Sequence, residues 1–482
     1  MKRCILLFAL LCATSLTQAQ IGIGTSSPNA ASQLDVSSTS KGFLPPRMTA
    51  LQRNAISTPV AGLMVWCSNC GSNGEIQIYN GIAWVNFIGG TRQMSSAIST
   101  KLGIDIDGEA NTDNSGMSVA ISSDGSIVAI GAPYNDGGGS NAGQVRVYRN
   151  IAGTWTQIGA DINGEAWEDY SGTSVAISSD GTKVAIGATG NSGNTGHVRV
   201  YQYSNNAWTK IGADIDGEAA EDNSGMSVAI SSDGTKVAIG APGNNLNTGQ
   251  VRVYQYSNNA WTKIGADIDG EAANDNSGWS VAISSDGTTV AIGALSNDGV
   301  GSNAGHVRVY KYITGAWTQI GVDIDGEAAS DFSGISVAMS SDGTTVAIGA
   351  TGNSGNTGHV RVYQYSNNAW TKIGADIDGE AALNNSGSSV AISSDGNTIA
   401  IGAPSNSNNN GTAAGQVRVY QNIAGTWTKL GLDIDGEAAY DNSGYSVAIS
   451  SDGTTVAIGA PYNDGGGSNA GQVRVYLHVG AL

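Results

Sequence analysis

The residues best suited to chemistry lie in an acidic segment that recurs along the chain. Four carboxylates stand at positions 1, 3, 5 and 9 of this segment, which is the spacing of a calcium-binding loop. In two of its copies these residues are Asp105, Asp107, Glu109 and Asp113, and Asp267, Asp269, Glu271 and Asp275. Position 6 is alanine, where a calcium loop uses glycine, and no bidentate glutamate follows at position 12. Calcium binding and a solvated turn with internal hydrogen bonds both stay open, and the turn is the simpler interpretation.

A catalytic constellation is harder to assemble from this sequence. His197, His306 and His359 occupy a slot that is glutamine in the other four copies, so we expect neither a metal ligand nor a general base there. The repeated serines have no histidine partner, so a Ser/His/Asp arrangement has no support. Pairs of acids leave glycoside chemistry formally open, but near-identical copies offer no asymmetric cluster. The sequence therefore predicts a protein that is not an enzyme.

A different set of positions varies strongly between the copies and makes a candidate ligand-binding face. Large apolar or aromatic side chains replace small or polar ones near the Ser-Gly that follows the acidic segment. These residues are Met117, Trp167, Met226, Trp279, Phe332, Ile335 and Tyr445. Evolutionary drift in loops would give variation too, so a binding face and drift are both open at this stage.

These residues are carried by seven copies of one unit of about 53 to 57 residues. Its most faithful segment, Asp-Ile-Asp-Gly-Glu-Ala, begins at Asp105, Asp161, Asp214, Asp267, Asp323, Asp376 and Asp433, with Asn163 the only substitution. Each copy contains four β-strand patterns, of which the first two flank a Ser-Asp-Gly hairpin turn. The fold class we predict is all-β, a seven-bladed β-propeller of four-stranded antiparallel blades over residues 91–482, behind a small β-rich N-terminal module at residues 20–90.

The ends of the repeat region predict closure of the ring. The seventh copy stops after its third strand, whereas Thr100-Lys-Leu-Gly before the first copy matches the fourth-strand segment Thr428-Lys-Leu-Gly. We therefore expect a strand within residues 96–104 to complete the last blade, which leaves no open edge between the first and last blades.

The repeats also carry a family resemblance. Asp331-Phe-Ser-Gly-Ile-Ser-Val-Ala, Val346-Ala-Ile-Gly-Ala and Gly358-His-Val-Arg-Val-Tyr, followed by Trp370-Thr, resemble the FG-GAP repeat of integrin-α-like propellers, in particular its bacterial branch. The resemblance implies adhesion or ligand binding outside the cell. The first-to-second-strand turn is too short here for the calcium loop of that family. In the N-terminal module, Gly42-Phe-Leu-Pro-Pro-Arg-Met-Thr resembles leaders of bacterial surface and tail-fibre-like proteins, and it predicts a spacer or an oligomerising stalk.

Composition and charge define the setting. Residues 1–19 have the basic start, apolar run and small-x-small end of a signal peptide, so we expect a secreted or cell-surface protein. Cys67 and Cys70 are the two cysteines left after processing, and an oxidised local disulfide is the expected state. A net charge of −18 argues against nucleic acid as a partner, and no stretch after the signal is apolar enough to insert into a membrane.

Together these observations predict an exported, non-catalytic propeller that acts in binding or adhesion at the bacterial cell surface. Its expected partner is an extracellular protein or glycan, and oligomerisation through the N-terminal module is open. We expect no cofactor apart from the calcium hypothesis. The alternatives are an extracellular hydrolase or lyase of the propeller type, and a structural spacer.

Overall fold

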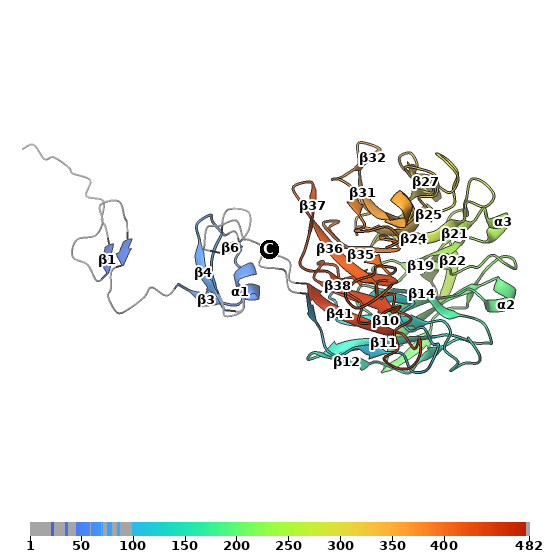
Figure 1. The fold of residues 1–482 in the computed structure, drawn as a ribbon, viewed down its shortest axis with the longest axis horizontal. Coiled ribbons are helices and arrows are strands. Elements are labelled where there is room, and N and C mark those ends of the chain that lie inside the picture. Colours follow the sequence, from blue (N-terminus) through green and yellow to red (C-terminus); the bar gives the residue numbers. More distant parts are fainter. Residues whose placement is uncertain are drawn as a thin grey trace, which may run out of the picture. The chain divides into compact units, whose positions relative to one another are not determined.

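The computed structural model describes residues 21–23, 34–36, 45–57, 59–68, 70, 75–79, 84–86 and 99–478. The chain divides into two compact units, Met1–Gln93 with Leu482 and Met94–Ala481 (Figure 1). The expected signal peptide lies outside the described residues. Within the described part of the chain, no helix has the length and apolar character needed to cross a membrane.

The described residues of the N-terminal unit form two small sheets and one short helix. Strands β1 (Ile21–Ile23) and β2 (Leu34–Val36) pair in parallel, and a second sheet has the order β3-β4-β5-β6. The elements of this second part are β3 (Arg47–Met48), α1 (Ala50–Asn54), β4 (Met64–Cys67), β5 (Glu75–Tyr79) and β6 (Trp84–Asn86). A disulfide joins Cys67 to Cys70, with 5.3 Å between their Cα atoms. The buried guanidinium of Arg53 donates to Gln77 Oε1, which ties α1 to β5.

The second unit is built from seven antiparallel sheets of one design, as the propeller prediction requires. We number them blades 1 to 7 in the order of their inner strands. The inner strands are β9 (Ser118–Ile121), β14 (Ser171–Ile177), β19 (Ser227–Ile230), β24 (Ser277–Ile283), β29 (Ser333–Met339), β34 (Ser389–Ile392) and β39 (Ser446–Ile449). The second strands are β10 (Ile127–Ala132), β15 (Lys183–Ala188), β20 (Lys236–Ala241), β25 (Thr289–Ala294), β30 (Thr345–Ala350), β35 (Thr398–Ala403) and β40 (Thr455–Ala460).

The outer half of each blade holds a long third strand and a short fourth strand. The third strands are β11 (Gln144–Ile151), β16 (His197–Ser204), β21 (Gln250–Ser257), β26 (His306–Ile313), β31 (His359–Ser366), β36 (Gln416–Ile423) and β41 (Gln472–His478). The fourth strands are β12 (Thr154–Gln157), β17 (Ala207–Lys210), β22 (Ala260–Lys263), β27 (Ala316–Gln319), β32 (Ala369–Lys372), β37 (Thr426–Lys429) and β7 (Ser99–Lys101). Three shorter loops after the second strands contain the single-turn helices α2 (Asn191–Asn194), α3 (Asn244–Asn247) and α4 (Asn353–Asn356).

The sequence predicted four strands per blade, and the structure adds a fifth, two-residue strand. These short strands are β13 (Ile162–Asn163), β18 (Ile215–Asp216), β23 (Ile268–Asp269), β28 (Ile324–Asp325), β33 (Ile377–Asp378), β38 (Ile434–Asp435) and β8 (Ile106–Asp107). Each pairs with the same third strand as the fourth strand does, so the outer edge of a blade is one strand interrupted after its first half. The left-handed Gly159 (φ 76°) marks this interruption in blade 1.

Hydrogen bonds of an aspartate hold the hairpin between the first and second strands. In blade 3, Asp233 Oδ1 accepts from Ser231 Oγ at 2.7 Å and from Thr235 N at 2.9 Å, and Gly234 takes the left-handed conformation (φ 66°). Partial burial raises the pKa of Asp233, but these hydrogen bonds outweigh it, and the net pKa lies below its ordinary value. The Ser-Asp-Gly turn read from the sequence therefore fixes the hairpin register locally.

Small residues allow adjacent blades to approach closely. A Cβ at Gly187 would collide with the backbone oxygen of Gly225 in the next blade, and the Ser174 hydroxyl donates to that oxygen at 2.7 Å. The same bond recurs at every blade boundary, and the last one runs from Ser446 Oγ to Gly116 O at 2.8 Å. The blades therefore form a closed ring, with buried Val and Ile clusters between neighbours.

The last blade is completed by a strand from before the first blade. In an antiparallel register, Lys101 pairs with Tyr476 and Ser99 with His478. In Figure 1 the red C-terminal blade accordingly lies beside the blue-green first blade. The Ser99 hydroxyl also lies 2.9 Å from Nδ1 of the buried His478, so this serine–histidine pair is a contact of ring closure.

Candidate functional site

The variable positions lie on one end of the ring, which we call the loop face. It is formed by the acidic loops that lead into the inner strands (residues 108–117 in blade 1) and by the connecting loops between second and third strands (residues 133–143 in blade 1). The two kinds of loop hydrogen-bond across blade boundaries, as when Glu168 N and Tyr170 N donate to Ser140 O and Asn141 O. One continuous surface therefore presents both kinds of loop.

In six of the seven acidic loops a buried aspartate at the ninth position accepts hydrogen bonds from the loop backbone, and the remaining loop has the buried Asn384 there. In blade 2, Asp169 Oδ2 accepts from Glu165 N at 2.9 Å and from Ala166 N at 2.8 Å, and its Oδ1 accepts from Asn191 Nδ2 at 3.2 Å. The residues on either side of it, Glu168 and Tyr170, have left-handed φ angles of 59° and 54°. All seven loops repeat this geometry, so the loop presents whatever side chains stand there in a fixed orientation.

The predicted binding residues lie on this face but differ in exposure. Trp167 is 67% exposed and Tyr445 is 39% exposed. The other predicted residues are half-buried, namely Met117, Met226, Trp279, Phe332 and Ile335. One variable residue per blade stands at or just before the start of the inner strand. The inner strands line a central channel of about 270 Å³ through Val-Ala-Ile segments such as Val119, Ala120 and Ile121. The residues after Ser-Gly therefore surround the mouth of this channel.

The sequence pointed to Tyr445 on the loop face, but not to the tyrosine cluster that surrounds it. The rings of Tyr134 and Tyr170 lie 5.6 Å apart, and those of Tyr445 and Tyr462 lie 6.4 Å apart. Burial raises the pKa of Tyr445, and the neighbouring hydroxyls of Tyr462 and Tyr134 raise it further, so blades 7 and 1 share this surface. A signal was available, because the first and seventh copies both contain Pro-Tyr-Asn-Asp and ring closure makes them neighbours.

The loop face carries charge of one sign. The acidic and connecting loops contain no lysine or arginine, whereas the glutamate of each acidic loop is 41–46% exposed. Each of these glutamates pairs with an arginine on the third strand of the blade into which its loop leads. Glu165, for example, lies 3.2 Å from Arg199, and this arginine is buried below the surface. A partner therefore meets carboxylates and aromatic rings on the loops themselves, and the nearest cations are partly exposed lysines of the outer edges, such as Lys210 beside Glu165.

The carboxylates of the calcium pattern each have separate partners in the first copy of the repeat. Asp105 contacts Lys101 Nζ at 2.8 Å, Asp107 accepts from Gln472, Glu109 lies 3.5 Å from Arg146, and Asp113 accepts from Asn135 Nδ2 at 2.9 Å. In the copy that begins at Asp267, that residue, Glu271 and Asp275 are likewise paired, and Asp269 is exposed. The structure thus gives every one of these side chains except Asp269 an internal partner, and calcium binding here stays a prediction.

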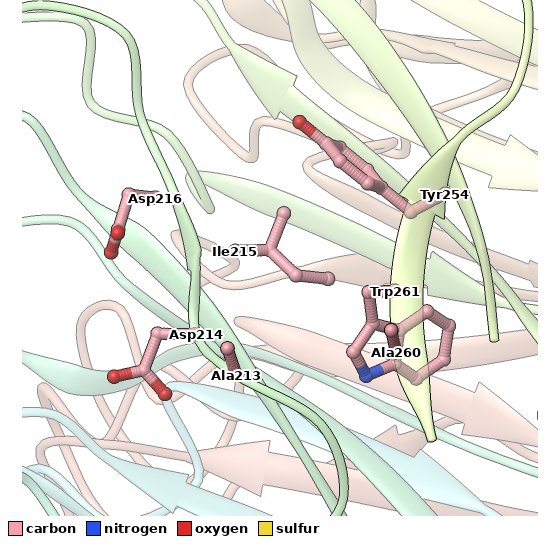
Figure 2. A pocket seen from close by; sticks show the side chains of 7 residues that line it. All are labelled: Ala213, Asp214, Ile215, Asp216, Tyr254, Ala260 and Trp261. Carbon is pink, nitrogen blue, oxygen red and sulfur yellow. The ribbon is translucent and has the colours of Figure 1, made fainter. Parts of the chain in front are cut away.

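The recurring tryptophans join neighbouring blades and also line clefts at the rim. Trp261 Nε1 donates to Ile211 O, at the interruption of the preceding outer edge, at 2.8 Å. Figure 2 shows the cleft beside it, about 230 Å³ in volume, in which Ile215, Tyr254 and Trp261 face the opening. A cleft of about 270 Å³ lies at the equivalent position beside Trp427. In Figure 2 the carboxylates of Asp214 and Asp216 point away from the rings, and the larger part of the cleft lining is apolar.

Comparison with known families agrees with this architecture. A model described as "FG-GAP repeat" matches residues 104–148, 263–310 and 433–476. The chain carries FG-GAP repeats. A second model, described as "Phage tail like trimerisation region", matches residues 22–101, which indicates oligomerisation through the N-terminal module. The expected resemblance to FG-GAP proteins with a tail-like leader is thereby confirmed, and the all-β propeller class with it.

Comparison with whole proteins gives less information about this chain than the family models do. No curated protein matches this chain. Among solved structures, a protein of Bacteroides uniformis provisionally named a 6-phosphogluconolactonase matches with a TM-score of 0.48 and 13% identity, over 76% of this chain and 93% of that one.

Proposed function

We propose that this chain is an exported, non-enzymatic binding protein whose loop face docks an extracellular protein or glycan at the bacterial cell surface. The observation that carries the proposal is the collection of large side chains at the channel mouth, on a ring whose strands scarcely vary. Trp167 and Tyr445 are exposed and the other large side chains are half-buried, and apolar surface left open to solvent usually marks an interaction site.

The physical character of the face narrows the class of partner. Aromatic side chains such as Trp279 and Tyr445 provide stacking area, and the rigid loops limit the entropy lost on binding. Because the loops contain no lysine or arginine, the face repels anionic ligands and suits a neutral or basic surface. We therefore expect a neutral glycan or a protein with basic side chains at its contact patch.

A trimer would multiply a weak contact made by one propeller. The N-terminal match to a trimerisation region supports three propellers per assembly. Linked sites raise the overall affinity through effective concentration when the target presents repeated ligands. Repeated ligands are typical of glycans and of cell surfaces, which fits the proposed setting.

The test uses substitutions that the repeat itself already contains. Trp279→Ser and Tyr445→Ser copy the residue of blade 6, Ser388, so the fold should tolerate them, and together they should weaken binding on a glycan and protein array at least tenfold. Ile313→Ser and Ile423→Ser are the matched control, because other copies have serine there and these exposed residues lie at the opposite end of the blades. Equal loss in both pairs, or unchanged binding in the first pair, would refute the proposed face.

A further inference from the structure

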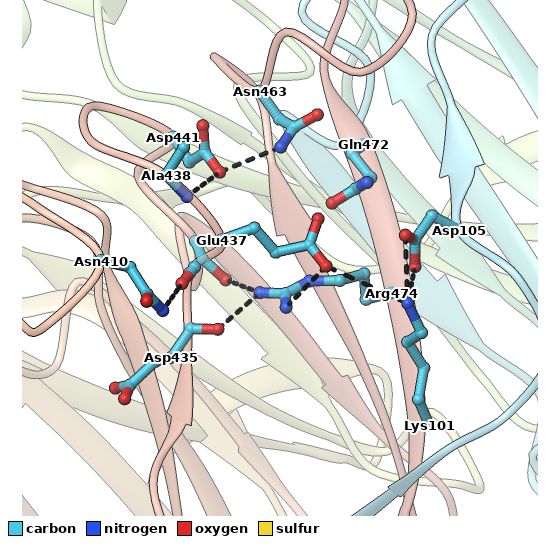
Figure 3. Close-up of polar contacts among 12 residues, drawn as sticks. Lys101, Asp105, Asn410, Asp435, Glu437, Ala438, Asp441, Asn463, Gln472 and Arg474 are labelled. Carbon is cyan, nitrogen blue, oxygen red and sulfur yellow. Dashed lines mark hydrogen bonds and ion pairs between the residues drawn. The ribbon is translucent and has the colours of Figure 1, made fainter.

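A lysine ammonium contacts an aspartate at the outer edge of five blades, and in two of them it also reaches a second carboxylate. In blade 7, Lys101 Nζ lies 2.8 Å from Asp105 and 4.0 Å from Glu437, beside the buried Arg474 that also contacts Glu437 (Figure 3). Blade 2 repeats this arrangement, with Lys210 Nζ 2.7 Å from Asp214 and 3.5 Å from Glu165. In these blades the lysine is the cation that balances the second carboxylate.

Blade 4 keeps the two carboxylates but has lost the lysine. Gln319 stands in its place and donates to Asp323 Oδ1 at 2.6 Å, while Glu271 still lies 3.6 Å from Arg308. The set of Glu271, Arg308, Gln319 and Asp323 therefore has one negative charge in excess, whereas the equivalent set of blade 7 is balanced.

An imidazole completes the cluster in blade 4. His306 replaces the Gln472 of blade 7, is 1% exposed, and its Nδ1 lies 3.8 Å from Glu271 Oε2. One ligand atom each from Glu271, His306 and Asp323 lies within 4.8 Å of the other two. Metal–ligand bonds of about 2.0–2.2 Å would require these atoms to draw together by roughly 1 Å.

We propose that Glu271, His306 and Asp323 bind one divalent transition-metal ion of the Zn²⁺ class, in place of the lysine ammonium of other blades. One imidazole and two carboxylates from three separate segments are a ligand set that such ions accept, with a further position open to water. The three segments are the acidic loop before blade 4, strand β26 and the residue before β28. A bound ion would therefore fasten the outer edge of blade 4 to its own acidic loop.

The other blades explain why the site is confined to blade 4. His359 lies in the same kind of cluster with Glu327 and Asp376, but Lys372 Nζ contacts Asp376 at 2.7 Å and already occupies the cation position. His197 likewise shares its blade with Lys210, and blade 1 has Gln157 and no histidine. The interchange of histidine and glutamine argues against a metal role common to all copies. Blade 4 alone combines the histidine with loss of the lysine.

The experiment is titration of the full-length, untagged protein with Zn²⁺ by calorimetry, with Co²⁺ absorption as a second readout. His306→Gln gives blade 4 the residues of blade 1, and Gln319→Lys gives it those of blade 5, so both variants should fold and both should bind Zn²⁺ at least tenfold more weakly. His359→Gln is the matched control and should leave the site intact. Lys372→Gln should create a second site, in blade 5.

Each outcome decides the proposal. One Zn²⁺ per chain that is lost in His306→Gln and Gln319→Lys, with melting curves unchanged in the absence of metal, supports it. Binding that survives both substitutions, binding that disappears in His359→Gln, or no binding at micromolar Zn²⁺ would overturn it. Failure of Lys372→Gln to add a second site would overturn the argument that the ammonium and the metal ion exclude each other.

Discussion

Removal of strand β7 tests how the ring is closed. A chain that begins at Asp105 lacks β7, whereas a chain that begins at Met94 keeps it, and both lack the N-terminal unit. The shorter chain loses the Lys101–Tyr476 register, the hydrogen bond from Leu102 N to Val475 O at 2.7 Å, and the contact of Leu102 with the core between blades 7 and 1. It also leaves the edge of β41 unpaired.

The size of the effect follows from these contacts. The backbone hydrogen bonds contribute about 1 kcal/mol each, and burial of part of Leu102 contributes roughly another 1 kcal/mol. Trp155 is buried and donates to Leu102 O at 2.7 Å, so loss of this acceptor costs about 1–3 kcal/mol. The free energy of unfolding should therefore fall by about 4–7 kcal/mol, out of a total of about 5–15 kcal/mol for a typical protein.

Differential scanning calorimetry and light scattering of the two chains provide the assay. The chain from Asp105 should melt roughly 10 °C lower or aggregate through its open edge, and a synthetic peptide of residues 94–104 should restore part of the loss by strand addition. If the two chains melt at the same temperature and both stay monomeric, the closure argument is wrong.

Three further outcomes are expected. Trp261→Phe removes the hydrogen bond to Ile211 O and should lower the free energy of unfolding by about 1–2 kcal/mol in denaturant titrations, whereas Trp167→Phe, at an exposed position, should change it little. Because Asp275 and its neighbouring acids have protein partners, millimolar calcium should leave Tm unchanged, and a rise that Asp275→Asn abolishes would instead establish the calcium site. Burial, with help from Arg199, lowers the pKa of His197, so the unfolded chain takes up its proton first and stability falls as pH drops through about 6.5. His197→Gln should flatten the dependence of Tm on pH between 7 and 5, and an unaltered profile would contradict the assignment.

The site was predicted less completely than the fold. Variation among copies pointed to the loop face, and Trp167 and Tyr445 are exposed there, but Trp279, Met117 and Met226 are half-buried. A residue's place in a repeat says which element carries it, but its exposure depends on the side chains of the adjacent blades. The acidic segments show the same dependence on tertiary structure. Their spacing suggested that the carboxylates share one ion, but in the folded protein each carboxylate of the first copy contacts a different side chain.

The sequence by itself determined what depends on neighbours a few residues away. The Ser-Asp-Gly turn, the alternating Val and Ile of the strands and the repeat period all act locally, and they were sufficient to predict the sheets and the propeller class. Even the closing strand could be read by matching Thr100-Lys-Leu-Gly with its equivalent in copy six, since the fourth strand has a recognisable pattern.

Only the tertiary structure decided which residues of different blades meet. Trp261 finds its acceptor fifty residues away, Tyr134 joins Tyr445 and Tyr462 through ring closure, and Glu271, His306 and Asp323 converge from three segments. The physical reason is that these contacts depend on the angle and distance between rigid sheets, which many inter-blade contacts set together. The repeat pattern predicts the features that all blades share. The proposed sites instead consist of residues that differ between blades, and only the packing of the blades shows which of these residues are in contact.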